Sequence, residues 1–401
     1  MLDASGRAIE TDSAAFLERV RPLTRDLSAP FDETATAVLG ALSRQLLTSA
    51  DARAEPQLTA LGYWLRPAAL ARLAERSRSV VAGALRVARG MAYQLPPQNV
   101  DTLFVYSWAL SFLVGNSNVT RLPSDGGPVV SGLIRRIVTE LERGGQSHRQ
   151  IFCSFDHRDR IGRELSALAD LRVVWGGDAK VRAVGANPIR PDGISVSFPD
   201  RKSICLVGTD AYDRLDEAGR TALAERFYND VFWFDQMGCG SPRVVVWLGE
   251  NGAIERDLLR RVSDVALAKG RSTDVGVDLS KFVFANASLC SGTANAASRL
   301  SPALTRISAD MASAILDEVH GGGLLFETHV PNIERLEPLI RRNLQTVATF
   351  GIEHDTKFAL ARLAGGRGGY RIVPIGEALQ FDAIWDGIDL IQQFSRLVVV
   401  R

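Results

Sequence analysis

The feature that most limits the fold is a regular alternation of short apolar runs with amphipathic stretches, which begins near Val87. Runs this apolar are typical of strands that are buried on both faces, and strands joined by helices pair in parallel through right-handed crossovers. Four predicted strands alternate with three predicted helices: 91–95, 101–114, 118–122, 128–143, 150–154, 158–169 and 171–175. The pattern therefore predicts a doubly wound α/β domain of the nucleotide-binding type over residues 90–208.

The sequence on either side of this region has a different pattern. Before it, apolar residues at helical spacing predict helices over 14–23, 33–47 and 67–89. After it, a second α/β set is predicted, with these helices and strands: 216–230, 243–248, 252–268, 282–285, 306–319, 323–326 and 346–351. We therefore expect three parts, namely a helical N-terminal region with the nucleotide-binding domain (1–208), a second α/β domain (209–375), and a C-terminal segment (376–401) that packs back as a strand or takes part in oligomerisation.

Composition excludes several classes of partner. The 401 residues carry 47 Lys and Arg against 46 Asp and Glu, so the net charge of +1 gives no basis for binding nucleic acid or an anionic membrane surface. Residues 102–120 carry no charge, but their strongly apolar part is too short to span a bilayer, which favours a buried helix and no membrane span. Four scattered cysteines and an N-terminus without an apolar leader favour a reducing cytoplasm.

The strongest local signal for chemistry is the segment 235–243, Asp-Gln-Met-Gly-Cys-Gly-Ser-Pro-Arg. Cys239 lies between two glycines, where the backbone can approach a substrate and no neighbouring side chain blocks attack on it. Two interpretations stay open: a nucleophile, or a small, inert, buried cysteine. Cys153, Cys205 and Cys290 lie in or beside apolar runs, which favours a packing role.

Three further motifs follow predicted strands. Asn99 follows a Pro-Pro turn and is either a helix N-cap or an amide donor to an oxyanion. Arg121 ends a strand and is followed by Ser124, an arrangement that suits a ribose phosphate or a merely solvated cation. The Gly176–Gly177 turn can contact phosphate, although the G-x-G-x-x-G fingerprint is absent. The five histidines have no ligand spacing, so we expect no metal site.

In this order, the motifs resemble the aldehyde dehydrogenase superfamily, and more closely its LuxC-like acyl-CoA reductase (fatty-acid reductase) branch. The similarity covers most of the chain after residue 60 and rests on a P-x-N-V turn (97–100), a G-N-x-N-x-x-R-x-x-S strand (115–124), a W-G-G turn (175–177) and a C-x-S-P loop (239–242). The resemblance implies a Rossmann-like cofactor domain, an α/β catalytic domain that holds the thiol, and a homo-oligomer.

The resemblance also implies roles for individual residues. Cys239 would be the nucleophile, and Asn99 with the N–H of Cys239 would form the oxyanion hole. Arg121 and Ser124 would lie near the adenosine ribose, where a cation without a carboxylate beside it favours NADPH over NADH. The turn at Gly176 and Gly177 would contact the cofactor.

Two departures from the superfamily bear on the reaction. Phe198 stands where the superfamily has the glutamate that activates the hydrolytic water, and a thioester without that base would survive until hydride arrives. Asp178 stands where many relatives have serine, which suits a helix N-cap better than a cofactor ligand.

The expected activity is therefore NADPH-dependent reduction of an acyl-CoA or acyl-carrier thioester to an aldehyde through an acyl-enzyme on Cys239, with an acyl-protein synthetase as a possible partner. The alternatives are a semialdehyde or acyl-phosphate dehydrogenase and a catalytically silent acyl-protein-binding partner. The acyl chain length, the carrier and the group that activates Cys239 stay open.

Overall fold

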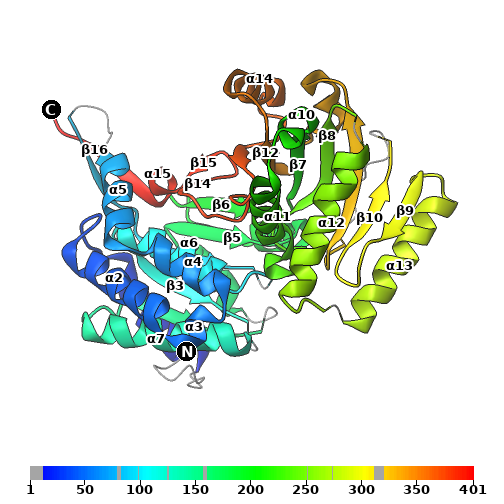
Figure 1. Cartoon of the computed structure of the whole chain (residues 1–401). Helices are drawn as coiled ribbons and strands as arrows, with labels where there is room; N and C mark the ends of the chain where they lie inside the picture. Colours follow the sequence, from blue (N-terminus) through cyan, green and yellow to red (C-terminus); the bar gives the residue numbers. More distant parts are fainter. Residues whose placement is uncertain are drawn as a thin grey trace. The chain divides into compact units, whose positions relative to one another are not determined.

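The computed structural model describes residues 12–78, 83–97, 99–123, 126–156, 160–250, 252–272, 274–310 and 320–401. The chain divides into two compact units, shown in Figure 1. Unit 1 consists of Met1–Pro199 and Phe381–Arg401, and unit 2 consists of Asp200–Gln380. Each unit is described by itself.

Unit 1 is built on a five-stranded, fully parallel sheet in the order β4-β3-β2-β5-β6. Its strands are β2 (Met91–Leu95), β3 (Ser117–Arg121), β4 (Gln150–Cys153), β5 (Leu171–Trp175) and β6 (Ile194–Phe198). The chain starts in the central strand, proceeds outward on one side to β4, and returns to form β5 and β6 on the other side. This order places a topological switch point between β2 and β5, and ligands of open α/β sheets bind at such points, outside the carboxyl ends of the strands.

Helices cover both faces of this sheet because alternate strand residues point to opposite sides. Ala92 packs in one core cluster, and its neighbours Met91 and Tyr93 pack in another. The first cluster includes residues of α2 (Glu33–Thr48), α4 (Pro56–Trp64), α5 (Pro67–Arg78), α6 (Leu103–Leu113) and α7 (Gly127–Arg143). The second cluster includes residues of α1 (Ser13–Val20), the 3₁₀ turn η1 (Arg21–Thr24), α8 (Ile161–Leu168) and α9 (Asp178–Gly185). The doubly wound domain predicted from the sequence is confirmed.

The uncharged stretch forms α6, which is buried along its whole length from Phe104 to Leu113. This agrees with the expectation of a buried helix. Across the described ranges, the chain contains no helix with the length and apolarity needed to cross a bilayer.

Unit 2 contains a seven-stranded sheet in the order β13-β12-β7-β8-β11-β10-β9, parallel throughout except for β9. Its strands are β7 (Lys202–Gly208), β8 (Pro242–Leu248), β9 (Ala296–Arg299), β10 (Thr305–Ser308), β11 (Leu324–Val330), β12 (Leu344–Phe350) and β13 (Arg371–Pro374). Strand β7 was expected to end the first domain. It lies instead in unit 2, because it pairs in parallel with both β8 and β12.

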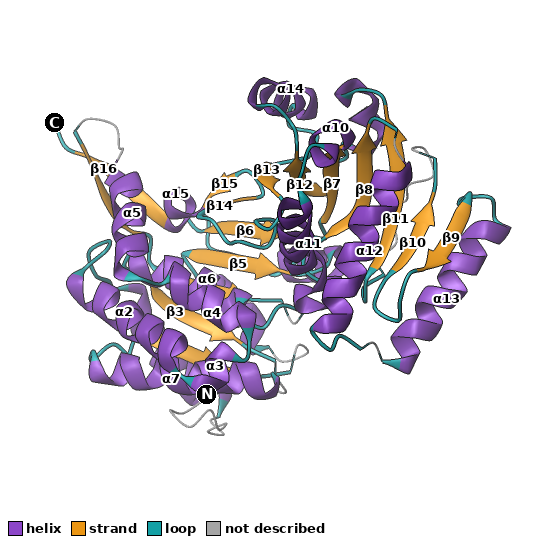
Figure 2. Cartoon of the chain, in the orientation of Figure 1, coloured by secondary structure: helices purple, strands orange, loops and turns teal. Residues whose placement is uncertain are grey.

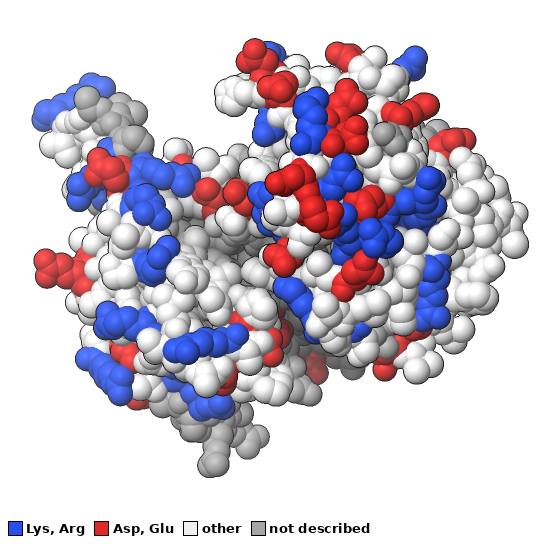
Figure 3. All heavy atoms as spheres, in the orientation of Figure 1, with Lys and Arg blue, Asp and Glu red and all other residues white. Residues whose placement is uncertain are grey.

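Helices cover both faces of this sheet as well (Figure 2). On one face, Val207 and Trp247 pack with residues of α10 (Thr209–Asp213), α11 (Glu217–Phe232) and α12 (Gly252–Ala268). On the other face, Leu206 and Val246 pack with residues of α13 (Val275–Cys290), the 3₁₀ segment η3 (Ile333–Leu339) and α14 (His354–Ala364). On the side of the molecule drawn in Figure 3, basic and acidic side chains are interspersed, as expected for a net charge of +1.

Three predicted elements are wrong in part. The helix predicted over 67–89 ends at Arg78, and Ala84–Ala88 is a strand, β1, paired antiparallel with β16 (Ser395–Val399). The strand predicted at 282–285 is part of helix α13. The helix predicted over 306–319 begins as strand β10, and residues 311–319 lie outside the described part. Short apolar runs fit a strand or a helix equally well, because four or five residues do not define a period.

The remaining elements are small: α3 (Ala50–Arg53), η2 (Trp233–Gln236), β14 (Ile384–Trp385), β15 (Ile388–Asp389) and α15 (Leu390–Phe394). The C-terminal strand expected at 397–400 is confirmed as β16.

Candidate active site

Cys239 lies in the loop between η2 and β8, at the start of a central strand of the unit 2 sheet. Its side chain is half-buried. The loop is tied to β7, because the hydroxyl of Ser203 donates to the carbonyl oxygen of Cys239 at 2.7 Å. A short turn closes after the thiol, where the N–H of Ser241 donates to the carbonyl of Gly238 at 3.0 Å. The thiol is therefore placed on a fixed backbone.

The backbone that leads to the thiol is strained. Phe234, Asp235 and Gln236 have φ values of 54°, 53° and 63°, so three consecutive residues with a Cβ occupy the left-handed region. Each such residue costs on the order of 1–3 kcal/mol and persists only where the surrounding structure determines it.

The side chain of Gln236 holds this strained backbone in place. It is completely buried and makes four hydrogen bonds with the backbone. Its Nε2 donates to the carbonyls of Pro242 and Leu324 at 2.9 and 3.0 Å, and its Oε1 accepts from the N–H groups of Gly323 and Leu324 at 3.0 and 3.1 Å. One amide thus joins the thiol loop to the first residue of β8 and to the start of β11.

A second segment packs against the glycine that follows the thiol. A Cβ on Gly240 would lie 2.3 Å from the carbonyl oxygen of Ala378, so only glycine fits at this position. The segment is held by buried Asp230 of α11, whose carboxyl accepts from the N–H groups of Gly376 and Ala378 at 2.7 and 3.0 Å. Burial raises the pKa of Asp230 to about 7, against the lowering effect of these two hydrogen bonds.

A buried cation lies at the start of β8, directly after the thiol loop. Arg243 follows Cys239 by four residues, is 7% exposed, and donates from Nη1 to the carbonyl oxygen of His320. Burial lowers its pKa to about 10, and the charge of Cys239 acts in the opposite direction. Because a nearby cation favours the ionised thiol, Arg243 is a group that can keep Cys239 reactive.

The other cysteines differ from Cys239. Cys153 and Cys205 are fully buried, and burial raises the pKa of Cys153 to about 12 and that of Cys205 well above its ordinary value. The packing role expected for these two agrees with their burial. Cys290 is exposed at the end of α13, so the expectation that it packs in a core is wrong.

The other predicted residues lie at the carboxyl ends of strands in unit 1. Asn99 is exposed and lies four residues after the end of β2. The N-cap of α6 is Thr102, not Asn99, so the N-cap interpretation of Asn99 does not hold for this helix. Asn99 and Cys239 belong to different units.

Arg121 is the last residue of β3. Its Nε and Nη2 both donate to the carbonyl oxygen of Phe155, at 3.1 and 2.9 Å, and its guanidinium lies 5.1 Å from the Phe155 ring centroid. Within the described ranges, Arg121 has no carboxylate partner. Ser124 lies outside the described residues.

The turn after β5 brings in a residue that the sequence did not reveal. Gly176 has φ 148°, and a Cβ there would lie 2.7 Å from Cδ of Lys180. Lys180, in the first turn of α9, donates from Nζ to the carbonyl of Pro96 at 2.8 Å, which links the ends of β5 and β2. Burial lowers the pKa of Lys180 to about 8, and the positive charge of Arg121 adds to this effect. Gly177 is the N-cap of α9.

Sequence comparison now identifies the family. The profile of the acyl-CoA reductase (LuxC) family matches residues 67–270, half of the chain. The chain belongs to the acyl-CoA reductase (LuxC) family. This family and the aldehyde dehydrogenase fold make it an oxidoreductase of the kind that reduces activated acyl groups to aldehydes.

Solved structures confirm the fold of this acyl-CoA reductase family member. A Burkholderia cenocepacia protein assigned to the aldehyde dehydrogenases aligns with a TM-score of 0.69 at 14% identity, over 99% of this chain and 94% of that one. An NAD-dependent benzaldehyde dehydrogenase from Corynebacterium glutamicum aligns with a TM-score of 0.66 at 16% identity, over 99% and 93%. A mutant of Thermus thermophilus 1-pyrroline-5-carboxylate dehydrogenase gives 0.66 at 14% identity, over 99% and 88%. No curated protein matches the sequence.

Two departures noted in the sequence have structural explanations in the reductase. Phe198 ends β6 and stacks on Trp175, with ring centroids 3.7 Å apart, so an aromatic side chain fills the position next to the Gly-Gly turn. Asp178 is the first residue of α9 rather than its N-cap, and it lies 3.9 Å from Arg182 in an exposed ion pair. The residues that the structure describes contain no group of His, Cys, Asp and Glu arranged to hold a metal ion.

Sequence reasoning missed Gln236, Arg243 and Lys180. Gln236 and Arg243 stand inside the quoted 235–243 segment, but their roles depend on Leu324 and His320, which are about eighty residues away. Lys180 has no local signal beyond its place three residues after the Gly-Gly turn.

Proposed function

We propose that the chain reduces an acyl thioester to an aldehyde through a thioester on Cys239, with NADPH as the source of hydride. The observation that carries this proposal is a half-buried thiol on a strained, internally held loop, with the buried cation of Arg243 four residues later at the start of β8. Reactive cysteines lie in such electropositive, partly accessible places, whereas buried cysteines with raised pKa values are inert.

The residues at the carboxyl edge of the unit 1 sheet fit a phosphate-rich dinucleotide. Arg121 and Lys180 supply positive charge without a carboxylate partner in the described residues, and the Gly176–Gly177 turn opens the helix α9, whose N–H groups can face phosphate. These residues would hold the cofactor, and Ser124 would lie near its ribose. A bound NADPH would supply the hydride.

The steps that the chain performs are as follows. The thiolate of Cys239 attacks the acyl carbonyl, the C–S bond to the carrier breaks, and the carrier leaves as a thiol. The amide of Asn99 and the N–H of Cys239 stabilise the oxyanion in this step and again when the thioester accepts hydride. The resulting thiohemiacetal releases aldehyde and regenerates the thiol. With Phe198 in place of a carboxylate, no base at that position activates water to hydrolyse the thioester.

The nucleophile is tested by acyl transfer. Cys239→Ser should retain no radioactive acyl group from acyl-CoA and should reduce acyl-CoA at less than about a thousandth of the normal rate, because the alcohol is not ionised. Cys290→Ser is the matched control, since it removes an exposed thiol of the same unit and should leave both measurements unchanged. Normal reduction of acyl-CoA by Cys239→Ser would show that the mechanism is wrong.

The cofactor preference is tested separately. Arg121→Glu should leave acylation of Cys239 intact but raise the KM for NADPH by about tenfold or more, because it replaces a phosphate-binding cation with an anion. The KM for NADH should change less, since NADH has no 2′-phosphate. An equal rise in the KM values for NADPH and NADH would show that Arg121 does not contact the 2′-phosphate of NADPH.

The surface of α13 supports a homo-oligomer. Val275, Leu279, Phe282 and Val283 are 82%, 61%, 67% and 55% exposed. Their spacing of four, three and one residues places them on one helix face, and exposed apolar faces of this kind are typical of protein interfaces. We propose that a second copy covers this face. Phe282→Asp should lower the assembly state in analytical ultracentrifugation, whereas the exposed Leu267→Asp of α12 should not.

A further inference from the structure

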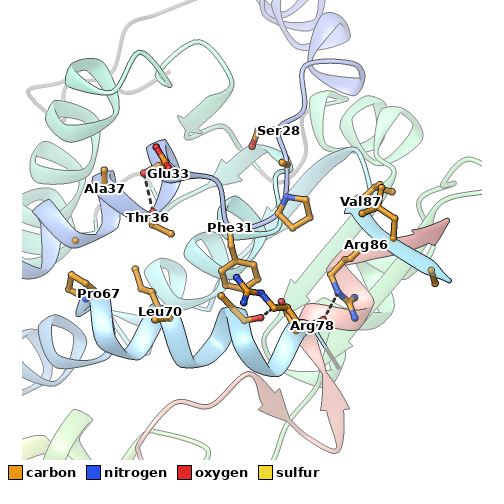
Figure 4. Close-up of a pocket in the computed structure, with 18 of the residues that line it drawn as sticks. Ser28, Phe31, Glu33, Thr36, Ala37, Pro67, Leu70, Arg78, Arg86 and Val87 are labelled. Atoms are coloured by element: carbon orange, nitrogen blue, oxygen red, sulfur yellow. Dashed lines mark hydrogen bonds between the residues drawn. The ribbon is translucent and has the colours of Figure 1, made fainter. Parts of the chain in front are cut away.

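A partly open hollow lies in unit 1, and no residue of the thiol loop lines it. It has a volume of about 910 Å³ and is lined by residues of α2, α5, β1 and the segment 28–31 (Figure 4). The volume falls in the range of about 300–1,000 Å³ that is typical of small-molecule sites. Its lining residues follow α5 from Pro67 at one end to Arg78 at the other, and Arg86 of β1 lies near the Arg78 end (Figure 4).

The hollow exists because small residues face one another across the two helices. Ala37 and Gly40 of α2 line it opposite Ala71 and Ala74 of α5. Phe31 forms a further wall between these helices (Figure 4). Its backbone is left-handed, with φ 56°, and its N–H donates to the carbonyl of Leu113 at 2.5 Å, so an aromatic ring is held in a costly conformation beside the space. The walls are therefore mainly apolar and fixed.

The lining of the hollow contains more basic than acidic side chains. The lining contains three arginines, Arg44, Arg78 and Arg86, and one carboxylate, Glu33. Arg86 donates to the Ser77 carbonyl and to the Ser395 hydroxyl, at 3.3 and 2.6 Å.

Arg44 has no ion pair within the described ranges, and the exposed partner of Arg78 is Glu75, at 3.2 Å, outside the lining. The hollow thus combines an apolar body with surplus positive charge.

We propose that this hollow binds an amphiphile with an anionic head and an extended apolar body, of which a medium-chain carboxylate is the simplest example. The head is held at the Arg78–Arg86 end, and the apolar chain lies along Ala74, Ala71 and Gly40 toward Pro67. Charge complementarity favours an anion over a neutral or cationic head, and the narrow, small-residue walls favour a chain over a bulky ring system.

Binding is tested by titrating the full-length chain with submicellar sodium laurate in a calorimeter. The wild type should bind one laurate per chain, and 1-dodecanol, which has the same chain without the charge, should bind about tenfold more weakly. Ala71→Phe combined with Ala74→Phe fills the hollow and should reduce affinity at least about tenfold. Ala68→Phe, on an exposed position of α5 outside the lining, is the matched control and should bind as the wild type does.

The charge is tested on the same helix. Arg78→Gln should weaken laurate binding about tenfold, whereas Arg72→Gln, an exposed arginine outside the lining, should not. This pair decides the outcome even if the phenylalanine variants do not fold. Cys239→Ala should bind laurate normally, which separates this site from the thiol site.

Three results would overturn the proposal: no laurate binding by the wild type, equal effects of Arg72→Gln and Arg78→Gln, or loss of binding in Cys239→Ala with retention in the filled variant. A filled variant that binds laurate normally but sediments at a different assembly state would instead show that the hollow is an interface between copies.

Discussion

The loop around Cys239 and the carboxyl edge of the five-stranded sheet are constructed in opposite ways. In the loop, a strained backbone is held by groups of the protein itself, above all by the four hydrogen bonds of Gln236. At the sheet edge, Asn99 is exposed, and Arg121 and Lys180 donate only to backbone carbonyls in the described residues. The difference indicates that the loop of Cys239, the proposed nucleophile, is organised by the protein itself, whereas the sheet edge keeps binding capacity for a ligand.

The largest effect is expected when the internal support of the loop is removed. Gln236→Leu removes four hydrogen bonds to buried backbone groups and should lower the free energy of unfolding of unit 2 by about 3–5 kcal/mol. It should also slow iodoacetamide labelling of Cys239 severalfold, because the thiol loses its fixed position. Urea unfolding and site-resolved mass spectrometry measure the two effects.

A matched control tests whether the loop is special. Gln94 of β2 is equally buried, accepts from the Ser107 hydroxyl at 2.6 Å and donates to Asn118 at 2.7 Å. Gln94→Leu should therefore destabilise unit 1 by about 2–4 kcal/mol without any change in the labelling of Cys239. If both variants leave labelling unchanged, the amide of Gln236 supports only the fold and does not position the thiol.

The fold was largely predictable because the central strands of both sheets are nearly continuous apolar runs. Leu171–Trp175 and Arg243–Leu248 lie in strands that are buried on both faces, and apolar runs that alternate regularly with helices are typical of a parallel sheet. The errors fall where burial is one-sided. Helix α13 carries apolar residues on an exposed face, and Ala84–Ala88 pairs with a strand about three hundred residues later. Neither fact is encoded locally.

The candidate site was predictable only where backbone geometry leaves a local trace. Glycines on both sides of Cys239 are visible in the sequence because a close approach, here of Ala378 to Gly240, allows nothing larger. Gln236, Arg243 and Lys180 leave no such trace, since a glutamine or a cation is common on any surface. Their functions come from partners brought near by folding.

A smaller effect is expected at Arg243, the buried cation directly after the thiol loop. Because Arg243 favours the thiolate, Arg243→Met should move the pH midpoint of Cys239 labelling upward by about one unit, and Arg243→Lys should move it less. The control is Arg306→Met, which removes a partly buried cation of the same sheet that pairs with Glu327 at 3.2 Å. If the pH midpoint of Cys239 labelling is unchanged in Arg243→Met, a group other than Arg243 activates the thiol.

The smallest effect is expected at Lys180, where binding and stability should respond in opposite directions. Its pKa of about 8 in the folded chain lies below the ordinary value of 10.5, so the fold disfavours the charged amine. The unfolded chain therefore binds more protons between pH 8 and 10.5, and the free energy of unfolding should rise over this interval. Below pH 8 the cost is fully present, so Lys180→Met should be more stable than the wild type at pH 7, by about 1–2 kcal/mol, and not at pH 10.5.

Nucleotide binding should respond in the opposite direction, because Lys180→Met should lower the affinity for NADPH at pH 7. A protonated Lys180 attracts phosphate, so the affinity for NADPH should fall as the pH rises through about 8, and Lys180→Met should be severalfold weaker than the wild type at pH 7 but equal to it above pH 9. Nicotinamide fluorescence titrations at both pH values measure this difference. A variant that gains stability and loses NADPH affinity would show that the sheet edge retains a buried charge for its ligand at the expense of the fold. A variant that loses both would make Lys180 a structural link between the ends of β2 and β5, with no part in binding.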